Sequence, residues 1–170
     1  MVSLVMMGRV TEAQKYSDLL DEYFREHPND RYHKGIHLNN ILQVFLEQDD
    51  ADGAERTIEQ HAKLKVFVPL SILHIRHFYV AKAWARLARL RDDLSKQVYR
   101  RDFRRALREL WLASDTPMMK SHYLAVKASY QETKGNYRKS MKTAAHALRL
   151  ADETDNDRVR LEPVSYTHLR

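Results

Sequence analysis

Residues that interrupt regular structure are scarce in this chain. Its 170 residues include 4 glycines and 4 prolines, too few for the turns that many short strands would need. Long elements are expected instead. Apolar residues recur every three or four positions in most stretches, which is the period of one helix face. The sequence therefore predicts an all-α protein without a sheet.

Three prolines divide the chain into segments of similar length. Pro28, Pro69 and Pro117 lie 41 and 48 residues apart, and each is expected to mark a helix boundary, because proline lacks a backbone donor and restricts its predecessor. The segments are predicted to be helix pairs over 1–27, 30–68, 70–115 and 117–153. An approximate repeat of this size is typical of a helical solenoid.

The clearest second helix of such a pair is predicted over 135–152. Gly135 and its polar neighbour are expected to form a tight turn. Ser140 is small, and Ala144, Ala147, Leu148 and Ala151 then recur at helical spacing on one stripe. Small residues let a neighbouring helix approach closely, so this stretch is expected to pack between helices rather than to hold a substrate.

The two ends of the array are expected to expose apolar surface. One stripe of the first unit comprises Ala13, Tyr16, Leu19, Leu20, Tyr23 and Phe24. Residues 2–7 are too few for the helix that should precede it, which is compatible with Met1 being internal to a longer gene. Leu19, Leu20 and Phe24 are then expected to be partly unpartnered. No capping surface is recognised after 153 either.

The third unit has the least regular pattern. No strong breaker interrupts the helical period from 71 to about 99, so one helix of about 28 residues is predicted there. The alternative is a break at Asp92 and Asp93. In either case a second helix is expected to open at Arg101, Asp102 and Phe103, and to continue through Leu110 and Trp111.

Several positions together resemble the tetratricopeptide repeat family. The fourth unit matches the pattern of large, aliphatic, aromatic, turn and small positions best, although Lys127 takes a small position and one extra residue precedes Gly135. Asp49 stands where the second unit would have its turn glycine. The matching residues are Tyr123, Val126, Tyr130, Gly135, Asn136, Tyr137, Ser140, Ala144, Ala147 and Leu148; Ile41, Phe45, Asp49, Asp50, Ala54 and Ile58; Gly8, Glu12 and Ala13; and Asp102, Phe103, Ala106 and Leu110.

The resemblance implies an α-α superhelix, a right-handed solenoid of antiparallel helix hairpins over 1–162. It also implies binding of protein segments without catalysis. The irregular units are more similar to repeats attached to bacterial signalling kinases and transcriptional activators, so the chain is interpreted as a fragment of a larger signalling or regulatory protein. Residues 163–170 resemble the translation of a sequencing adapter and are assigned to no domain.

Positive charge is concentrated in one segment. The whole chain has a net charge of +6, whereas 82–108 contains ten basic residues against three aspartates, a net of +7. An acidic partner should therefore bind there. The candidate binding residues are Arg86, Arg89, Arg100, Arg101, Arg104, Arg105 and Arg108.

Three interpretations of this basic segment stay open. It could bind an acidic protein segment or a neighbouring domain of the same parent chain. It could bind nucleic acid, with Trp84, Tyr99 and Trp111 available for stacking. It could also be a solvated helix face without a specific ligand. The tryptophans and tyrosines themselves are assigned to the core.

No catalytic, metal or cofactor motif is recognised. His33 and His37, and likewise His74 and His77, are spaced to share a helix face, but no third ligand accompanies either pair. The four glycines are isolated, so no phosphate-binding loop is expected. The chain is therefore predicted not to be an enzyme and to need no cofactor.

Compartment is inferred from what the composition lacks. The chain has no cysteine, which fits a reducing compartment, and the cytoplasm is expected. It has no apolar run of about 18 residues, and its first nine residues do not resemble a signal peptide, so no membrane span is predicted.

Overall fold

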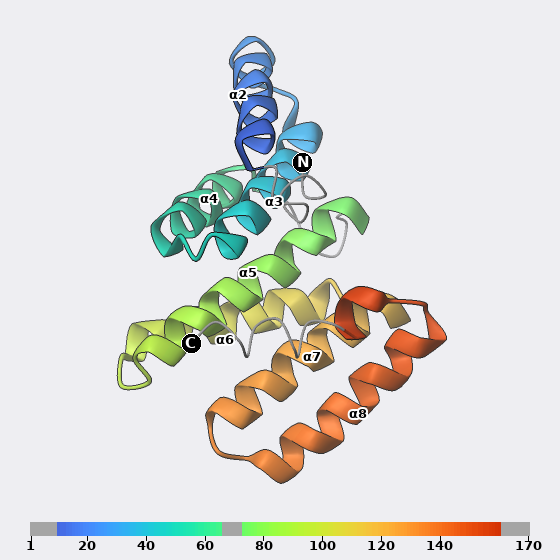
Figure 1. Cartoon of the computed structure of the whole chain (residues 1–170). Helices are drawn as coiled ribbons and strands as arrows, with labels where there is room; N and C mark the ends of the chain where they lie inside the picture. Colours follow the sequence, from blue (N-terminus) through green and yellow to red (C-terminus); the bar gives the residue numbers. More distant parts are fainter. Residues whose placement is uncertain (1–9, 66–72, 161–170) are drawn as a thin grey trace. The chain divides into compact units, whose positions relative to one another are not determined.

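The computed structural model describes residues 10–65 and 73–160, and these are helical throughout apart from short connections (Figure 1). No strand occurs in these two ranges, so the all-α prediction is confirmed for them. The helices are α2 (Val10–Glu26), α3 (Arg31–Glu47), α4 (Ala51–Lys63), α5 (Leu73–Asp92), α6 (Gln97–Leu112), α7 (Pro117–Thr133) and α8 (Tyr137–Glu153).

The chain divides into two compact units, Met1–Ala85 and Arg86–Arg170, and helix α5 contributes to both. The most extensively packed neighbours are α3 with α4 in the first unit and α7 with α8 in the second, while α2 also contacts α3 and α6 also contacts α7. The predicted boundary at Pro69 and the short segment 2–7 lie outside the described residues, as does 163–170.

The first unit is built on a close contact between α3 and α4. Asp50 caps α4 by accepting a hydrogen bond from the Gly53 backbone N–H at 2.8 Å. A Cβ atom at Gly53 would lie 2.5 Å from the Phe45 ring of α3, so only glycine lets the helices approach this closely. Leu38 and Leu42 of α3 and Ile58 of α4 are buried.

A buried histidine joins α4 to α5 within this unit. His61 stacks on Phe78 with ring centroids 3.6 Å apart and planes 10° from parallel. Its Nε2 atom has no hydrogen-bond partner among the described residues. Burial, with a smaller contribution from the positive charge of Lys82, lowers the pKa of His61 from 6.5 to about 4. The neutral ring is therefore the form that fits the core.

Helix α2 keeps much of its apolar surface in contact with solvent. Phe24 is buried, contrary to the expectation that it is partly unpartnered. Its ring lies 5.4 Å from the ring of His37 in α3. Leu19 is 62% exposed, and Tyr16, Leu20 and Tyr23 are exposed beside it. The first unit thus has the unpaired apolar stripe that the sequence predicts for Leu19 and Leu20, but α3 covers Phe24.

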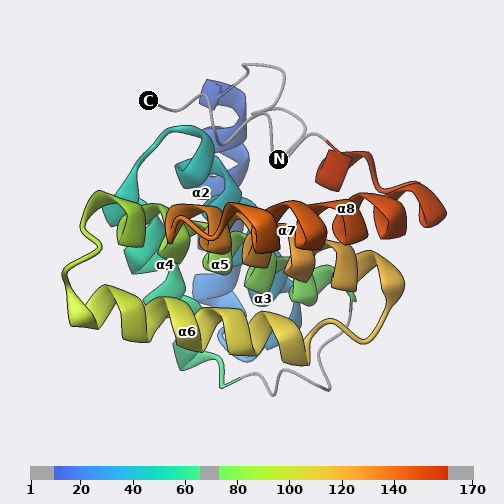
Figure 2. The same ribbon diagram turned by 90° about the horizontal axis from the view of Figure 1, so that it is seen from below.

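The second unit contains the α7–α8 hairpin, whose helices run antiparallel and side by side (Figures 1 and 2). Ala147 and Ala151 of α8 are buried. The Ser140 hydroxyl donates a hydrogen bond to the Ala128 carbonyl of α7 at 2.8 Å. The predicted small-residue stripe is therefore a packing surface. Leu148 was placed on it wrongly, since this side chain is 39% exposed.

Three helices, α3, α7 and α8, end in the same way. Each is followed by a residue with positive φ, and the next backbone N–H bonds back to a carbonyl five residues earlier, as in a Schellman motif. The residues with positive φ are Asp49 (55°), Gly135 (74°) and Asp155 (50°). The hydrogen bonds join Asp50 to Phe45 (2.9 Å), Asn136 to Gln131 (2.9 Å) and Asn156 to Ala151 (2.8 Å). Asp49 thus has the turn conformation expected where a glycine would otherwise stand.

The single long helix predicted over 71–99 is wrong, and the alternative break after Asp92 is correct. Helix α5 ends at Asp92 and α6 begins at Gln97, four residues before the predicted opening at Arg101. The Asp93 carboxylate accepts hydrogen bonds from the Ser95 backbone N–H at 2.9 Å and from its hydroxyl at 2.5 Å. These local bonds satisfy the backbone outside a helix and end α5.

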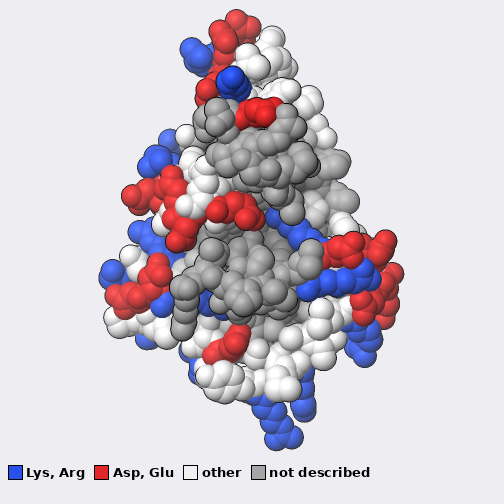
Figure 3. Space-filling view, in the orientation of Figure 1, with Lys and Arg blue, Asp and Glu red and all other residues white. Residues whose placement is uncertain are grey.

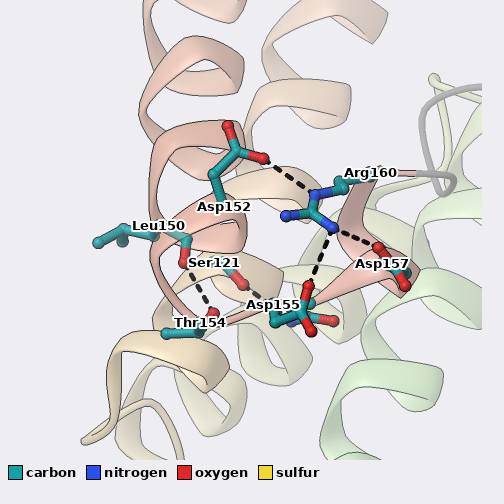
Figure 4. A network of polar contacts seen from close by, with 8 residues as sticks. Ser121, Leu150, Asp152, Thr154, Asp155, Asp157 and Arg160 are labelled. Carbon is teal, nitrogen blue, oxygen red and sulfur yellow. Dashed lines mark hydrogen bonds and ion pairs between the residues drawn. The ribbon is translucent and has the colours of Figure 1, made fainter.

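After α8 the chain turns back onto α7. The Asn156 amide donates a hydrogen bond to the Ser121 hydroxyl at 3.1 Å, and Val159 is fully buried. Arg160 then contacts three carboxylates (Figure 4): its Nε lies 2.9 Å from Asp152, and its Nη1 contacts Asp155 and Asp157. This end of the hairpin is covered by its own chain. The outer side of α8 is open, with Tyr137 and Met141 exposed.

Acid should destabilise the first unit through His61. Its pKa in the folded protein lies below its ordinary value, so the unfolded chain binds the proton first. The stability that neutral His61 contributes is therefore fully present above about pH 6.5, and it is lost as the pH falls toward 4. The loss from this residue should be about 3 kcal/mol. Urea unfolding near neutral pH and near pH 4 measures it, and His61→Phe should show a correspondingly smaller loss. An equal loss in both proteins would contradict the prediction.

Ala147→Arg should destabilise the α7–α8 hairpin by about 2–4 kcal/mol, because Ala147 is 2% exposed and a long cation there must either displace α7 or be buried. Ala145→Arg is the matched control on the exposed side of the same helix, and it should change stability by less than about 0.5 kcal/mol. Thermal unfolding of both variants measures this. Equal melting temperatures would show that the register of α8 is different.

Candidate partner-binding site

Helix α6 is held in place by three inward side chains. Phe103, Ala106 and Leu110 are at most 1% exposed. The Phe103 ring lies 4.7 Å from the ring of Tyr130 in α7, measured between centroids. These residues recur at three and four positions, so they share one side of the helix. Their burial fixes the rotation of α6 and directs the opposite side to solvent.

The exposed side of α6 is rich in arginine. Arg100, Arg101, Arg104, Arg105 and Arg108 are all exposed, and together they are called the arginine face here. A helix turns about 100° per residue, so these side chains are distributed over about 140° of its circumference. Helix α6 contains two carboxylates against these five arginines, a net charge of +3. Such a surface attracts carboxylates and other anions.

Most of this charge is not neutralised by strong ion pairs. Arg101 Nε lies 3.4 Å from the Asp102 carboxylate, and Arg105 Nε lies 3.2 Å from that of Glu109. Both arginines are exposed, and exposed pairs of this kind contribute little. Arg100 donates a hydrogen bond to the Leu94 carbonyl at 2.7 Å. Within the described residues, no ion pair involves Arg104 or Arg108, so both guanidinium groups are available to a partner.

Trp111 belongs to the same surface. It is 59% exposed, and it follows Arg104 by seven positions and Arg108 by three, which places it beside both on the helix. Val98 and Leu112 are also exposed on α6. The assignment of Trp111 to the core is therefore wrong, whereas Trp84 is buried as expected. The spacing from the arginines was the sequence signal that could have identified Trp111 as a surface residue.

The two remaining candidate arginines do not join the arginine face. Arg86 and Arg89 belong to α5 and are half-buried. The Arg89 guanidinium lies 4.8 Å from the ring centroid of Tyr99, and the Lys96 ammonium lies 4.9 Å from it. Hydrogen bonds from Arg89 and then Lys96 lower the pKa of Tyr99. Arg89 and Lys96 thus hold the connection between α5 and α6 through Tyr99. The candidate binding residues are therefore the exposed arginines of α6.

The side chains of His33 and His37 do not come together on one metal site. The His33 Nδ1 atom lies 2.7 Å from the Asp30 carboxylate, while the His37 Nε2 atom lies 3.2 Å from Asp21. They therefore have separate partners although they are four residues apart. No group of three His, Asp or Glu side chains in 10–65 and 73–160 is placed to share a metal ion. The side chain of His74 lies outside the described residues.

The face of the molecule shown in Figure 3 has mixed charge, with Lys and Arg interspersed among Asp and Glu along both flanks. A second basic group lies at the α7–α8 turn, where Lys134, Arg138 and Lys139 are exposed. It lacks an exposed tryptophan. None of the described helices is long and apolar enough to cross a membrane.

Comparison with known proteins gives no assignment. No protein-family model matches the chain, and no curated protein or solved structure matches it significantly. The arrangement of side chains on α6 is therefore the basis for inferring function.

The arginine face should bias the quenching of Trp111 fluorescence. Trp84→Phe leaves Trp111 as the only tryptophan of the chain. Relative to free N-acetyltryptophanamide, iodide should quench this residue more strongly than caesium ion does, because Arg104 and Arg108 concentrate anions around it. This excess over the free indole should disappear at high salt and in R104E/R108E. The same iodide-to-caesium ratio for Trp111 and for the free indole at low salt would show that Trp111 is not close to these arginines.

Proposed function

We propose that this chain is a non-catalytic protein-interaction module in which the arginine face of α6 binds an acidic segment. The segment belongs to another protein or to a neighbouring domain of the same parent chain. The observation that supports this best is an exposed tryptophan beside Arg104 and Arg108, on a helix whose opposite side is fixed in the core. Arginine pairs with carboxylates through two parallel hydrogen bonds, and tryptophan supplies an apolar anchor.

The tetratricopeptide-like interpretation is part of this proposal. It is supported by the shared turn geometry after α3, α7 and α8 and by the small residues between α7 and α8. A right-handed solenoid, with further hairpins in a larger bacterial signalling or regulatory protein of the cytoplasm, is the arrangement that we infer. Stacked hairpins in such an array present extended surfaces on which partner segments bind.

An acidic protein segment suits α6 better than nucleic acid does. Val98, Trp111 and Leu112 add apolar surface among the charges, which matches a peptide with alternating acidic and apolar residues. Nucleic acid is retained as the second candidate, because Trp111 could stack on a base.

A synthetic peptide of alternating Glu and Leu is the probe for the first function. It should shift the Trp111 emission to shorter wavelength in the Trp84→Phe protein, because binding removes the indole from water. R104E/R108E should weaken binding about tenfold or more. K139E/K142E, the matched control on exposed lysines of α8, should leave binding nearly unchanged.

Salt dependence decides between the two candidates. Peptide binding should decrease moderately with salt, because Trp111 and its apolar neighbours contribute a part that ions do not screen. An oligothymidylate should bind weakly. Tight oligothymidylate binding that is lost steeply with added salt, together with no peptide binding, would replace the first function with the second.

A further inference from the structure

Helix α2 exposes a stripe with the opposite character to the arginine face. The α2 stripe consists of Tyr16, Leu19, Leu20 and Tyr23, which are between 36% and 62% exposed. At about 100° per residue these four side chains fall within about 100° of the circumference. A stripe of two tyrosines and two leucines in water is typical of a protein interface.

The polar residues of α2 make this stripe acidic. The helix contains five carboxylates against one lysine and one arginine, a net charge of −3. Glu22 and Glu26 are exposed one helical turn apart and lie beside Leu19 at the edge of the stripe. The α2 stripe thus combines apolar surface with negative charge, which is the chemistry that the arginine face should bind.

The two surfaces match in several respects. Their helices are 17 and 16 residues long, about 25 Å each. Their net charges are −3 and +3. Glu22 and Glu26 are four residues apart, as are Arg104 and Arg108, so two ion pairs can form at once with the helices parallel or antiparallel. In the antiparallel arrangement Glu22 meets Arg108 and Glu26 meets Arg104, and Leu19, three residues before Glu22, then lies opposite Trp111, three residues after Arg108.

We infer that the α2 stripe of one copy binds the arginine face of a second copy, so that the chain self-associates. This inference rests on the proposed function, because it uses the same face of α6. The interface is heterologous, since the two contributing surfaces differ. Two single helices bury less surface than a standard protein interface, so the association should be weak and sensitive to salt.

A charge swap tests this pairing with the full chain. Sedimentation equilibrium at low salt should show a mass that rises with wild-type concentration. E22R/E26R alone and R104E/R108E alone should each remain monomeric, because each places like charges opposite one another. An equimolar mixture of the two variants should associate again, because it offers two complementary contacts: the unaltered arginine face of E22R/E26R with the unaltered α2 stripe of R104E/R108E, and the introduced carboxylates on α6 with the introduced guanidinium groups on α2. Circular dichroism checks that both variants keep their helix content.

Three results would overturn the inference. The first is a monomeric wild type, and the second is association that neither charge variant weakens, which would indicate contact through other apolar surfaces such as that of α8. The third is a mixture that stays monomeric. K139E/K142E is the control and should associate as the wild type does.

The acidic peptide separates this inference from the proposed function. E22R/E26R keeps an intact arginine face, so it should still bind the Glu and Leu peptide while it fails to self-associate. If the peptide binds but the wild type is monomeric, the function stands and the self-association is rejected. If the mixture of the two variants associates but the peptide does not bind, the arginine face is specific for α2 of its own chain. The proposed binding of acidic segments from other proteins is then rejected.

Discussion

The inward anchoring of α6 determines what the rest of that helix can do. Phe103 and Leu110 are fully buried, and burial of such side chains stabilises a fold by about 1.5–3 kcal/mol each. No rotation of α6 that buried an arginine instead could compete, because an unpaired buried charge costs several kcal/mol. The five arginines and Trp111 are therefore on the surface as a consequence of the core. These six side chains point to the same side of α6 without any contact between them being required.

The helix pairs follow from local chemistry, and most of them could be predicted from the sequence. Asp49 and Gly135 adopt positive φ at the ends of α3 and α7, and both positions were recognisable because turn residues followed long apolar periods. The end of α5 was harder to predict. The apolar period continues from Leu90 to Leu94 and Val98, so it does not show the break. The hydrogen bonds from Ser95 to the Asp93 carboxylate determine where α5 ends. They replace helical backbone hydrogen bonds over only three residues, so their sequence signal is short.

The sequence predicts the basic segment that contains the candidate site, but it does not predict which of its arginines are exposed together on one helix face. Counting charges locates 82–108, yet it cannot separate Arg86 and Arg89, which are half-buried on α5, from the exposed arginines of α6. That difference depends on tertiary contacts. Arg91, for example, donates hydrogen bonds to Ser129 and Thr133 of α7 at 2.6 and 3.0 Å, and these partners are about 40 residues away in the sequence. Trp111 was missed because composition favours burial of tryptophan, while its register with Arg104 and Arg108 favours exposure.

A single basic face has a further consequence when two acidic ligands can reach it. The α2 stripe and an acidic partner segment would occupy the same arginines, so their binding is mutually exclusive. Self-association then lowers the apparent affinity for the partner by mass action. The factor is one plus the chain concentration divided by Kd, where Kd is the dissociation constant for the pairing between copies. A weak pairing has little effect on a dilute chain and a large effect where copies are concentrated. The same charges that attract the partner would thus make its binding depend on the local density of the chain.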